Sequence, residues 1–240
     1  MYCMKSNKES LIIDEINNMI VTKEVLPLDK LPSENELAER FGVPRLTVRH
    51  ALNQLEVRGQ IFAKKGKGRY VREPASLIHL HLTGEESFSD KMHQAGYLLR
   101  TENLIFQKME YDKALYQELE IQKENACYEV ARVRYIDEQP LAIHRSYVSD
   151  VLFPFIEKDG PKITSMFSYY RQFGYTHFTS NKSLLSIVYP TAAEQELLNM
   201  PSMIPLILLE SNTIDEQTGK LLEYTKISYR SDKFKYKISN

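Results

Sequence analysis

A dense group of basic residues lies in the N-terminal third of the chain. Between positions 40 and 72 there are nine Lys and Arg residues and one acid, Glu56, which leaves a local charge of +8. The whole chain of 240 residues has a net charge of −1, so the positive charge is concentrated in this segment. Such a concentration indicates a surface that faces a polyanion, although a basic face exposed only to water has the same composition.

Two of these arginines have the spacing that a DNA-reading helix requires. Arg45 and Arg49 are four residues apart, so they share one face of a helix. A different face carries the apolar stripe of the segment, formed by Val48, Leu52 and Leu55. With the hydroxyl of Thr47 nearby, the two guanidinium groups can pair with guanine edges or with phosphates in a major groove.

The elements around this helix form a predicted winged helix-turn-helix. Apolar residues at helical spacing predict a first helix over 6–22. Ser33 and Glu36 form a capping box that starts a second helix, and Gly42 ends it. A third helix follows from about Pro44 to Gly59. The strand-like stretches 61–63 and 69–71 flank a turn of lysines and glycines, which predicts a basic wing that reaches the DNA backbone or the minor groove.

A second pair of arginines lies in the remainder of the chain. Residues 127–136 have the pattern of a strand, and its period of two places Arg132 and Arg134 on the same face. Two neighbouring guanidinium groups repel each other unless an anion lies between them. The pair therefore indicates an anion-binding site, while pairing with acids inside the domain is the alternative.

Other polar residues can contribute to the same site. Glu223 and Tyr229 share one face of a later strand, and Ser87 and Ser89 lie at a predicted helix start, where free N–H groups favour an anion. Together these residues suggest a pocket with an anion-binding end and a polar end. Such a pocket suits a sugar phosphate or a similar small acid.

The remaining signals alternate between strand and helix. The predicted strands cover 104–106, 127–136, 141–148, 176–188 and the two flanks of 215–219, and the predicted helices cover 87–96, 112–119, 151–157, 163–172 and 191–198. We therefore predict an α+β domain around an antiparallel sheet. The expected organisation is a DNA-binding domain over 1–74, a linker over 75–84 and an effector-binding and dimerisation domain over 85–240.

Composition and motifs exclude several classes of protein. Hydrophobic residues make up 42% and charged residues 26%, which excludes a disordered chain. Cys3 and Cys127 have no metal-ligand spacing, and no nucleophile–base pair is recognisable, so we expect no cofactor, metal or catalytic residue. No apolar run reaches the ~18–20 residues of a membrane span, and no signal peptide is recognisable. We expect a cytoplasmic protein with no membrane partner.

The first domain resembles the GntR family of bacterial winged helix-turn-helix regulators. The matching segments are LPSENELA at 31–38, FGVPRLTVR at 41–49 and GKG at 66–68. By this resemblance, the DNA-binding residues are Asn35, Arg45, Thr47, Arg49, Lys65, Lys67 and Gly68. Asn35 stands where the family commonly has arginine, and Pro44 stands where it commonly has a Ser or Thr cap. These two departures imply a different operator sequence or affinity.

The second domain resembles the UTRA effector domain, which defines the HutC subgroup of this family and has a chorismate-lyase-like fold. The matching segments are 87–89, 132–134, 140–147, 223–224 and 229–232. The resemblance implies an effector site formed by Ser87, Ser89, Arg132, Arg134, Ser165, Glu223 and Tyr229. His144 stands where the subgroup often has glutamate, and Phe167 stands where tyrosine is frequent. Both belong to the expected site and alter its polar end, because histidine can donate and phenylalanine lacks a hydroxyl.

Three functions remain to be compared. The leading one is a regulator, expected to be a repressor, that binds double-stranded operator DNA as a homodimer and is released by a small anionic effector. The second is a small-molecule enzyme with the chorismate-lyase-like fold, for which the sequence has no catalytic constellation. The third is an interaction module, which leaves the basic segment unexplained. Salt-dependent binding to duplex DNA separates the first function from the other two.

Overall fold

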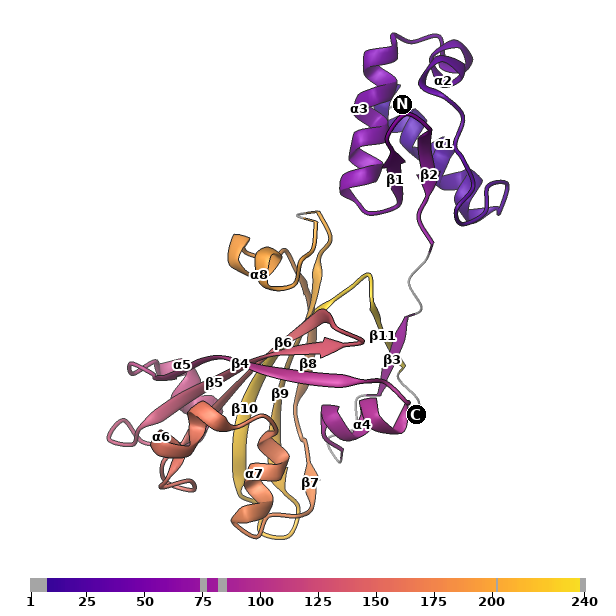
Figure 1. The fold of residues 1–240 in the computed structure, drawn as a ribbon. Coiled ribbons are helices and arrows are strands. Elements are labelled where there is room, and N and C mark those ends of the chain that lie inside the picture. Colours follow the sequence, from indigo (N-terminus) through magenta and orange to yellow (C-terminus); the bar gives the residue numbers. More distant parts are fainter. Residues whose placement is uncertain (1–7, 74–76, 82–85, 202, 238–240) are drawn as a thin grey trace. The chain divides into compact units, whose positions relative to one another are not determined.

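The chain folds into two compact units, each with its own core (Figure 1). The structure is a computed structural model that describes residues 8–73, 77–81, 86–201 and 203–237. One unit comprises Met1–Ser76 with Pro201–Ile204, and the other comprises Leu77–Met200 with Pro205–Asn240. No helix among the described residues is long and apolar enough to cross a membrane.

The first unit contains three helices and a two-stranded hairpin. Its elements are α1 (Lys8–Val21), α2 (Glu34–Phe41), α3 (Arg45–Val57), β1 (Ile61–Lys64) and β2 (Gly68–Val71). The predicted capping box is present, because the Ser33 side chain accepts from the Glu36 N–H and the Glu36 carboxylate accepts from the Ser33 N–H. Gly42 ends α2 with a φ of 58°, in the left-handed region that glycine adopts readily. The predicted winged helix-turn-helix is therefore present.

The second unit is built on an antiparallel seven-stranded sheet (Figure 1). Its strands are β4 (Leu99–Lys108), β5 (Cys127–Ile136), β6 (Gln139–Ser149), β7 (Phe178–Thr179), β8 (Ser183–Val188), β9 (Leu206–Asp215) and β10 (Leu221–Arg230). The order across the sheet is β4-β5-β6-β10-β9-β7, and β8 also pairs with β9. The predicted α+β fold with an antiparallel sheet is therefore confirmed.

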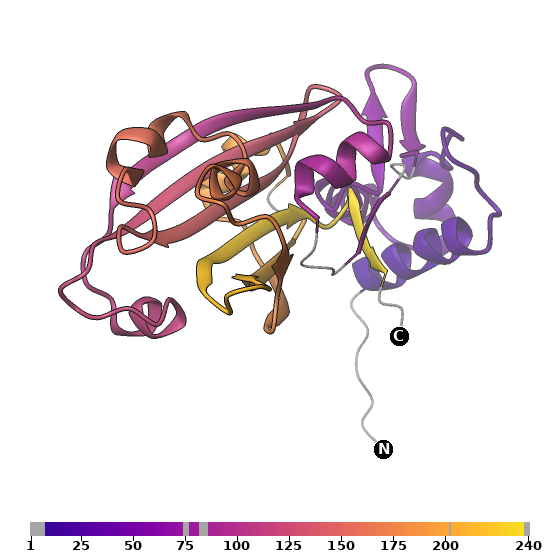
Figure 2. The same cartoon turned by 90° about the horizontal axis from the view of Figure 1, so that it is seen from below.

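One face of this sheet carries most of the packed core (Figures 1 and 2). It is covered by α4 (Phe88–Gln94), α6 (Ile156–Asp159), the 3-10 turn η1 (Gly160–Lys162), α7 (Met166–Gln172), and the short parallel pair β3 (Ile78–His81) and β11 (Phe234–Lys237). Val130 and Val148 pack against α6 and α7, while Ala142 and Ile227 pack against α4, β3 and β11. The opposite face contacts α5 (Lys113–Glu118) and α8 (Ala192–Leu197). The polar residues described below lie between the two apolar clusters of the first face.

Two predicted elements have wrong boundaries, and each has a local physical reason. The helix predicted over 151–157 begins only at Ile156, because Pro154 disfavours helical geometry in the residue before it. The strand predicted over 176–188 is divided into β7 and β8. Between them, Ser180 donates to the Lys182 carbonyl and Asn181 donates its N–H to the Asn212 side chain, so these groups leave the strand ladder.

The expected linker also contains regular structure. Residues 78–81 form β3, in which Ile78 and Leu80 are buried and pair in register with Phe234 and Tyr236 of β11. The other residues of the expected linker, apart from Leu77, lie outside the described residues. The segment 78–81 is therefore part of the second unit and not a free connection.

Candidate DNA interface and effector site

The helix α3 presents its two arginines to solvent. The side chains of Arg45 and Arg49 are about half exposed, at 58% and 49%. An adjoining side of the helix is fully buried through Val48, Leu52 and Leu55. Pro44 precedes the helix and makes no side-chain capping bond, which matches the departure noted in the sequence. Thr47 lies half-buried in the first turn of α3.

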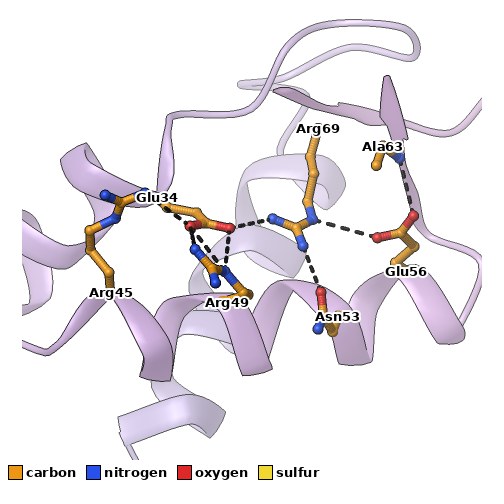
Figure 3. Close-up of polar contacts among 7 residues, drawn as sticks. All are labelled: Glu34, Arg45, Arg49, Asn53, Glu56, Ala63 and Arg69. Atoms are coloured by element: carbon orange, nitrogen blue, oxygen red, sulfur yellow. Dashed lines mark hydrogen bonds and ion pairs between the residues drawn. The ribbon is translucent and has the colours of Figure 1, made fainter. Parts of the chain in front are cut away.

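One carboxylate, that of Glu34, holds the arginines of this surface (Figure 3). Arg49 donates to it through Nη2 at 3.0 Å and Nε at 3.2 Å, and Arg45 approaches through Nη2 at 3.4 Å. Arg69 of β2 donates to the same carboxylate through Nη1 at 2.9 Å. The hydrogen bonds from Arg49 and then from Arg69 lower the pKa of Glu34 to about 2. Glu34 is therefore ionised throughout the neutral range.

Arg69 also ties the wing to α3 (Figure 3). Its Nη2 donates to the side-chain oxygen of Asn53 at 2.6 Å, and its Nε lies 3.5 Å from the Glu56 carboxylate. Glu56 in turn accepts from the N–H of Ala63 in β1 at 3.2 Å. Glu34 and Arg69 are distant along the chain and no spacing rule connects them, so the sequence did not predict this network.

A basic groove lies between the wing and the first turns of α2 and α3. It has a volume of about 450 Å³, and it brings together five of the predicted DNA-binding residues, namely Asn35, Arg45, Lys65, Lys67 and Gly68. Gly66 and Gly68 have φ values of 74° and 116°, so the tight tip of the wing needs glycine at both positions. Thr47 and Arg49 do not line the groove. Arg49 is joined to it through Glu34, the partner that it shares with Arg45.

A cavity of about 130 Å³ lies in the second unit, on the covered face of the sheet. Seven of the nine predicted effector-site residues line it, namely Ser87, Arg132, Arg134, His144, Phe167, Glu223 and Tyr229. Ser89 and Ser165 do not. Ser165 accepts from the N–H of Ser168 at 3.3 Å as the cap of α7, and Ser89 lies half-buried in α4. Ser87 is likewise committed, because its hydroxyl accepts from the Asp90 N–H and donates to the Asp90 carboxylate.

The two arginines of this cavity are almost completely buried, with 2% and 4% exposure for Arg132 and Arg134. Arg132 donates to Ser146, and Arg134 donates to Thr101 and to the Thr164 carbonyl. Among the described residues neither guanidinium has an ion pair, and the Nε of each has no hydrogen-bond partner. The described residues therefore do not show the alternative, in which the two arginines form ion pairs with internal acids.

Burial without an ion pair changes the energetics of these arginines. Desolvation, followed by repulsion from Arg132, lowers the pKa of Arg134 to about 9. Desolvation also lowers the pKa of Arg132, although Glu223 favours its charged form. A guanidinium group is not deprotonated in proteins at neutral pH, so the cavity holds two positive charges that an anion would stabilise.

His144 lies against the same two arginines. Its ring meets the Phe88 ring edge-on at 4.8 Å between centroids, and the Tyr229 ring at 5.8 Å. Burial, then repulsion from Arg134 and Arg132, lowers the pKa of His144 well below its usual 6.5. Its Nε2 is buried and has no hydrogen-bond partner among the described residues. At pH 7 the residue is a neutral imidazole with one unused polar atom at the cavity.

A row of hydroxyl groups forms another part of the cavity wall. It crosses four neighbouring strands in register and consists of Ser146 of β6, Thr225 of β10, Ser211 of β9 and Ser183 of β8. The hydroxyl oxygens of Ser183 and Ser211 are 3.1 Å apart. The row was not predicted from the sequence, although Ser146 and His144 alternate on their strand as Arg132 and Arg134 do. The missing information was the pairing of β6 with β10, which no local pattern supplies.

The site also has one buried acid. Glu223 is 4% exposed, and its Oε1 accepts from the Thr213 hydroxyl at 2.9 Å. Phe167 forms part of the apolar wall and packs on Phe178 at 4.2 Å between ring centroids. The cavity therefore combines a basic region, a hydroxyl row, one carboxylate and aromatic walls. A winged helix-turn-helix head joined to a second domain with a polar cavity is the architecture of a DNA-binding regulator.

Comparisons with known proteins place this regulator in a family. Residues 8–71 match the bacterial regulatory proteins of the gntR family, and residues 94–235 match the UTRA domain. The chain belongs to the GntR family, in the HutC group that carries a UTRA domain, and it is a helix-turn-helix transcriptional repressor. The family consists of transcription regulators, so the alternative of an enzyme is set aside.

The similarity extends over nearly the whole chain. The mannosyl-D-glycerate transport/metabolism system repressor MngR of Escherichia coli is 28% identical, over 95% of this chain and 93% of its own length. The HTH-type transcriptional repressor NagR of Bacillus subtilis is 26% identical, over 97% of each chain. The crystal structure of PhnF from Mycobacterium smegmatis has the same fold, with a TM-score of 0.58, 21% identity, and coverage of 95% of this chain and 99% of its own.

Proposed function

We propose that this repressor reads its operator through α3 and the wing. Arg45 and Arg49 pair with base edges or phosphates in the major groove, and Thr47 and Asn35 add polar contacts at the start of α3 and α2. Lys65, Lys67 and Gly68 bring the wing to the DNA backbone. The support for this assignment is the groove that gathers five of these residues on one side of the head.

The operator is expected to be a pseudo-palindrome bound by a homodimer. Two copies of α3 would then enter major grooves one helical turn apart. Light scattering of the complex with a selected duplex tests this part, and two chains per duplex are expected. One chain per duplex would contradict it. Because the DNA of a bacterial cell lies in the cytoplasm, we place the protein there.

We further propose that the effector is a small hydroxylated anion, such as a sugar phosphate, bound in the cavity of the second unit. The single observation that carries this proposal is the buried arginine pair without an ion pair among the described residues. An anionic group between Arg132 and Arg134 would relieve their mutual repulsion and use their free N–H groups. The hydroxyl row and Glu223 can then bond to hydroxyl groups of the ligand, and His144 offers a neutral polar atom.

Ligand binding would release the DNA by shifting an equilibrium. The dimer has a DNA-competent arrangement of its two heads and a released one, and the effector favours the released one by its higher affinity for it. Phe88 lies over both Arg134 and His144, at 5.8 Å from the Arg134 guanidinium carbon and 4.8 Å from the His144 ring. The helix α4 would therefore respond directly to what the cavity holds.

A thermal-shift panel tests the ligand class. It contains sugar phosphates, the same sugars without phosphate, sugar acids and amino-acid derivatives, each with the parent protein and with Arg134→Ala. At least one hydroxylated anion is expected to raise the unfolding midpoint of the parent, while its uncharged counterpart and the variant show little effect. Equal shifts with the uncharged sugar, or with Arg134→Ala, would contradict the proposed site.

A further inference from the structure

Glu34 is an acid placed where the head would meet a polyanion. It is the first residue of α2, and its carboxylate accepts from arginines of two different elements, α3 and β2 (Figure 3). The side chain of Glu34 is 18% exposed, so its contacts are partly shielded from solvent. An acid at this position reduces the attraction for DNA. Its presence there therefore suggests another purpose.

The geometry of the Arg49 contact indicates what that purpose is. Both Nε and Nη2 of Arg49 donate to Glu34, so one edge of the guanidinium is occupied by the carboxylate. The other edge, formed by the outward N–H groups of Nη1 and Nη2, remains available for a second planar partner. A guanine edge accepts two parallel N–H bonds from a guanidinium held in a fixed orientation. Glu34 thus fixes the orientation of Arg49 for pairing with a base edge, and it limits the freedom of Arg49 to pair with phosphates.

The charge balance supports the same role. Arg45, Arg49 and Arg69 with Glu34 carry a combined charge of +2, whereas the three arginines alone would carry +3. Affinity for arbitrary DNA depends on the number of phosphates that the protein neutralises. This affinity falls when an arginine is already paired with a carboxylate. Base contacts at an operator depend instead on orientation. One carboxylate can therefore weaken non-specific binding while it supports specific binding.

We propose that Glu34 sets the discrimination between operator and other DNA, as a positioning residue for Arg49 and Arg45. This inference rests on the proposed recognition helix. Removal of the carboxylate frees the arginines for phosphates, so binding to arbitrary DNA strengthens. Binding to the operator does not gain equally, because the arginines no longer have a fixed orientation. The ratio of the two affinities falls.

The test compares Glu34→Gln with Glu39→Gln. Both variants remove one negative charge from α2, but Glu39 is exposed and makes no side-chain contact with the three arginines. The probes are a duplex selected by the parent protein from a random library and a shuffled duplex of the same composition. For Glu34→Gln, binding to the shuffled duplex is expected to rise about three- to tenfold, with a salt slope steeper by about 0.9, the value of one added phosphate contact. Glu39→Gln is expected to change the ratio by less than twofold, roughly the effect of a remote screened charge.

Two results would overturn the inference. One is an equal change of the ratio in both variants, which would make the effect one of net charge alone. The other is an equal change in the affinity for both duplexes when Glu34→Gln replaces the parent. If Glu34→Gln does not fold, Glu34→Asp replaces it, since it keeps the charge and shortens the side chain by one methylene. A reduced ratio with an unchanged salt slope is then expected, and an unchanged ratio contradicts the proposal.

Arg49→Ala in the same titrations separates this inference from the function on which it rests. If Arg49→Ala binds the selected duplex as the parent does, the recognition helix itself is wrongly assigned. If Arg49→Ala weakens that binding while Glu34→Gln leaves the ratio unchanged, only the role of Glu34 fails.

Discussion

The two arginine pairs of this molecule are held in opposite ways. Arg45 and Arg49 are about half exposed and share the carboxylate of Glu34. Arg132 and Arg134 are 2% and 4% exposed, and neither has an ion pair among the described residues. The net charge of the chain is near zero. The two pairs therefore differ in exposure and in ion pairing because of the residues that surround each of them.

Each pair requires something different from the anion that it meets. Ion pairs of half-exposed arginines contribute little stability, so the role that we propose for Glu34 is orientation. Buried charges without a direct ion pair destabilise the fold, and an anionic ligand would offset that cost on binding. The first pair is therefore suited to DNA that binds arginines already oriented by a partner. The second pair is suited to a ligand that supplies a missing one.

The largest expected effect is on effector binding. Arg134→Ala is expected to weaken the ligand found by the thermal-shift panel by about 2–5 kcal/mol, or roughly 30-fold or more in Kd, because it removes a buried charge partner of the anion. Calorimetric titration of the parent and the variant measures this weakening. The unfolding midpoint of the unliganded variant serves as the folding control. A Kd within a factor of two of the parent would show that the buried pair is structural.

The next effect is on operator binding. Arg49→Ala is expected to cost about 1–3 kcal/mol on the selected duplex and less on a shuffled duplex, because the variant can no longer pair with a base edge. Titrations of both duplexes at a fixed salt concentration measure the two costs. Equal costs would show that Arg49 contacts only phosphate, and unchanged affinity would remove it from the interface.

A smaller effect concerns pH and His144. Its pKa in the folded state lies below the unfolded value of about 6.5, so below that pH the unfolded state binds a proton that the folded state does not. Stability therefore declines as the pH falls from about 6.5, by at most about 1.4 kcal/mol per pH unit, and the effect is absent above it. Urea unfolding of the parent and of His144→Gln between pH 5 and 8 isolates this contribution. Parallel curves for the two proteins would contradict the burial of a neutral histidine.

The smallest effect is expected at the wing. Lys65 and Lys67 lie at an exposed tip, so Lys65→Ala with Lys67→Ala removes cations that face phosphates and no group that reads a base. Affinity is expected to fall similarly on operator and shuffled duplexes, and the salt slope is expected to flatten by about 0.9 for each phosphate that is no longer neutralised. Binding measured across a salt series checks both values. An unchanged slope would place the wing away from the DNA.

Local sequence patterns predicted the parts of the fold that have local causes. Ser33 and Glu36 are three residues apart, and Gly42 supplies a left-handed residue, so the limits of α2 followed from neighbouring residues alone. The alternation of Arg132 and Arg134 likewise placed both on one face. The start of α6 was predicted wrongly, because Pro154 disfavours helical geometry in the residue before it and delays the helix to Ile156.

Distant pairings could not be predicted in the same way. The contact between Glu34 and Arg69 joins α2 to the wing, and the pairing of β3 with β11 joins the two ends of the second unit. The hydroxyl row depends on the register of β10 against both β6 and β9. Such features arise from the packing of the whole unit, because no spacing within a single element encodes them.

The proposed function requires coupling between the ligand cavity and the DNA interface. The most direct measurement is the Kd of the effector for the free protein and for the protein saturated with its selected duplex, together with the Kd of the duplex with and without effector. Linkage requires both ratios to be equal, and release of the operator requires the DNA-bound form to bind effector more weakly, by a factor of about 5–150. Equal effector affinity for the free and the DNA-bound protein would contradict the coupling.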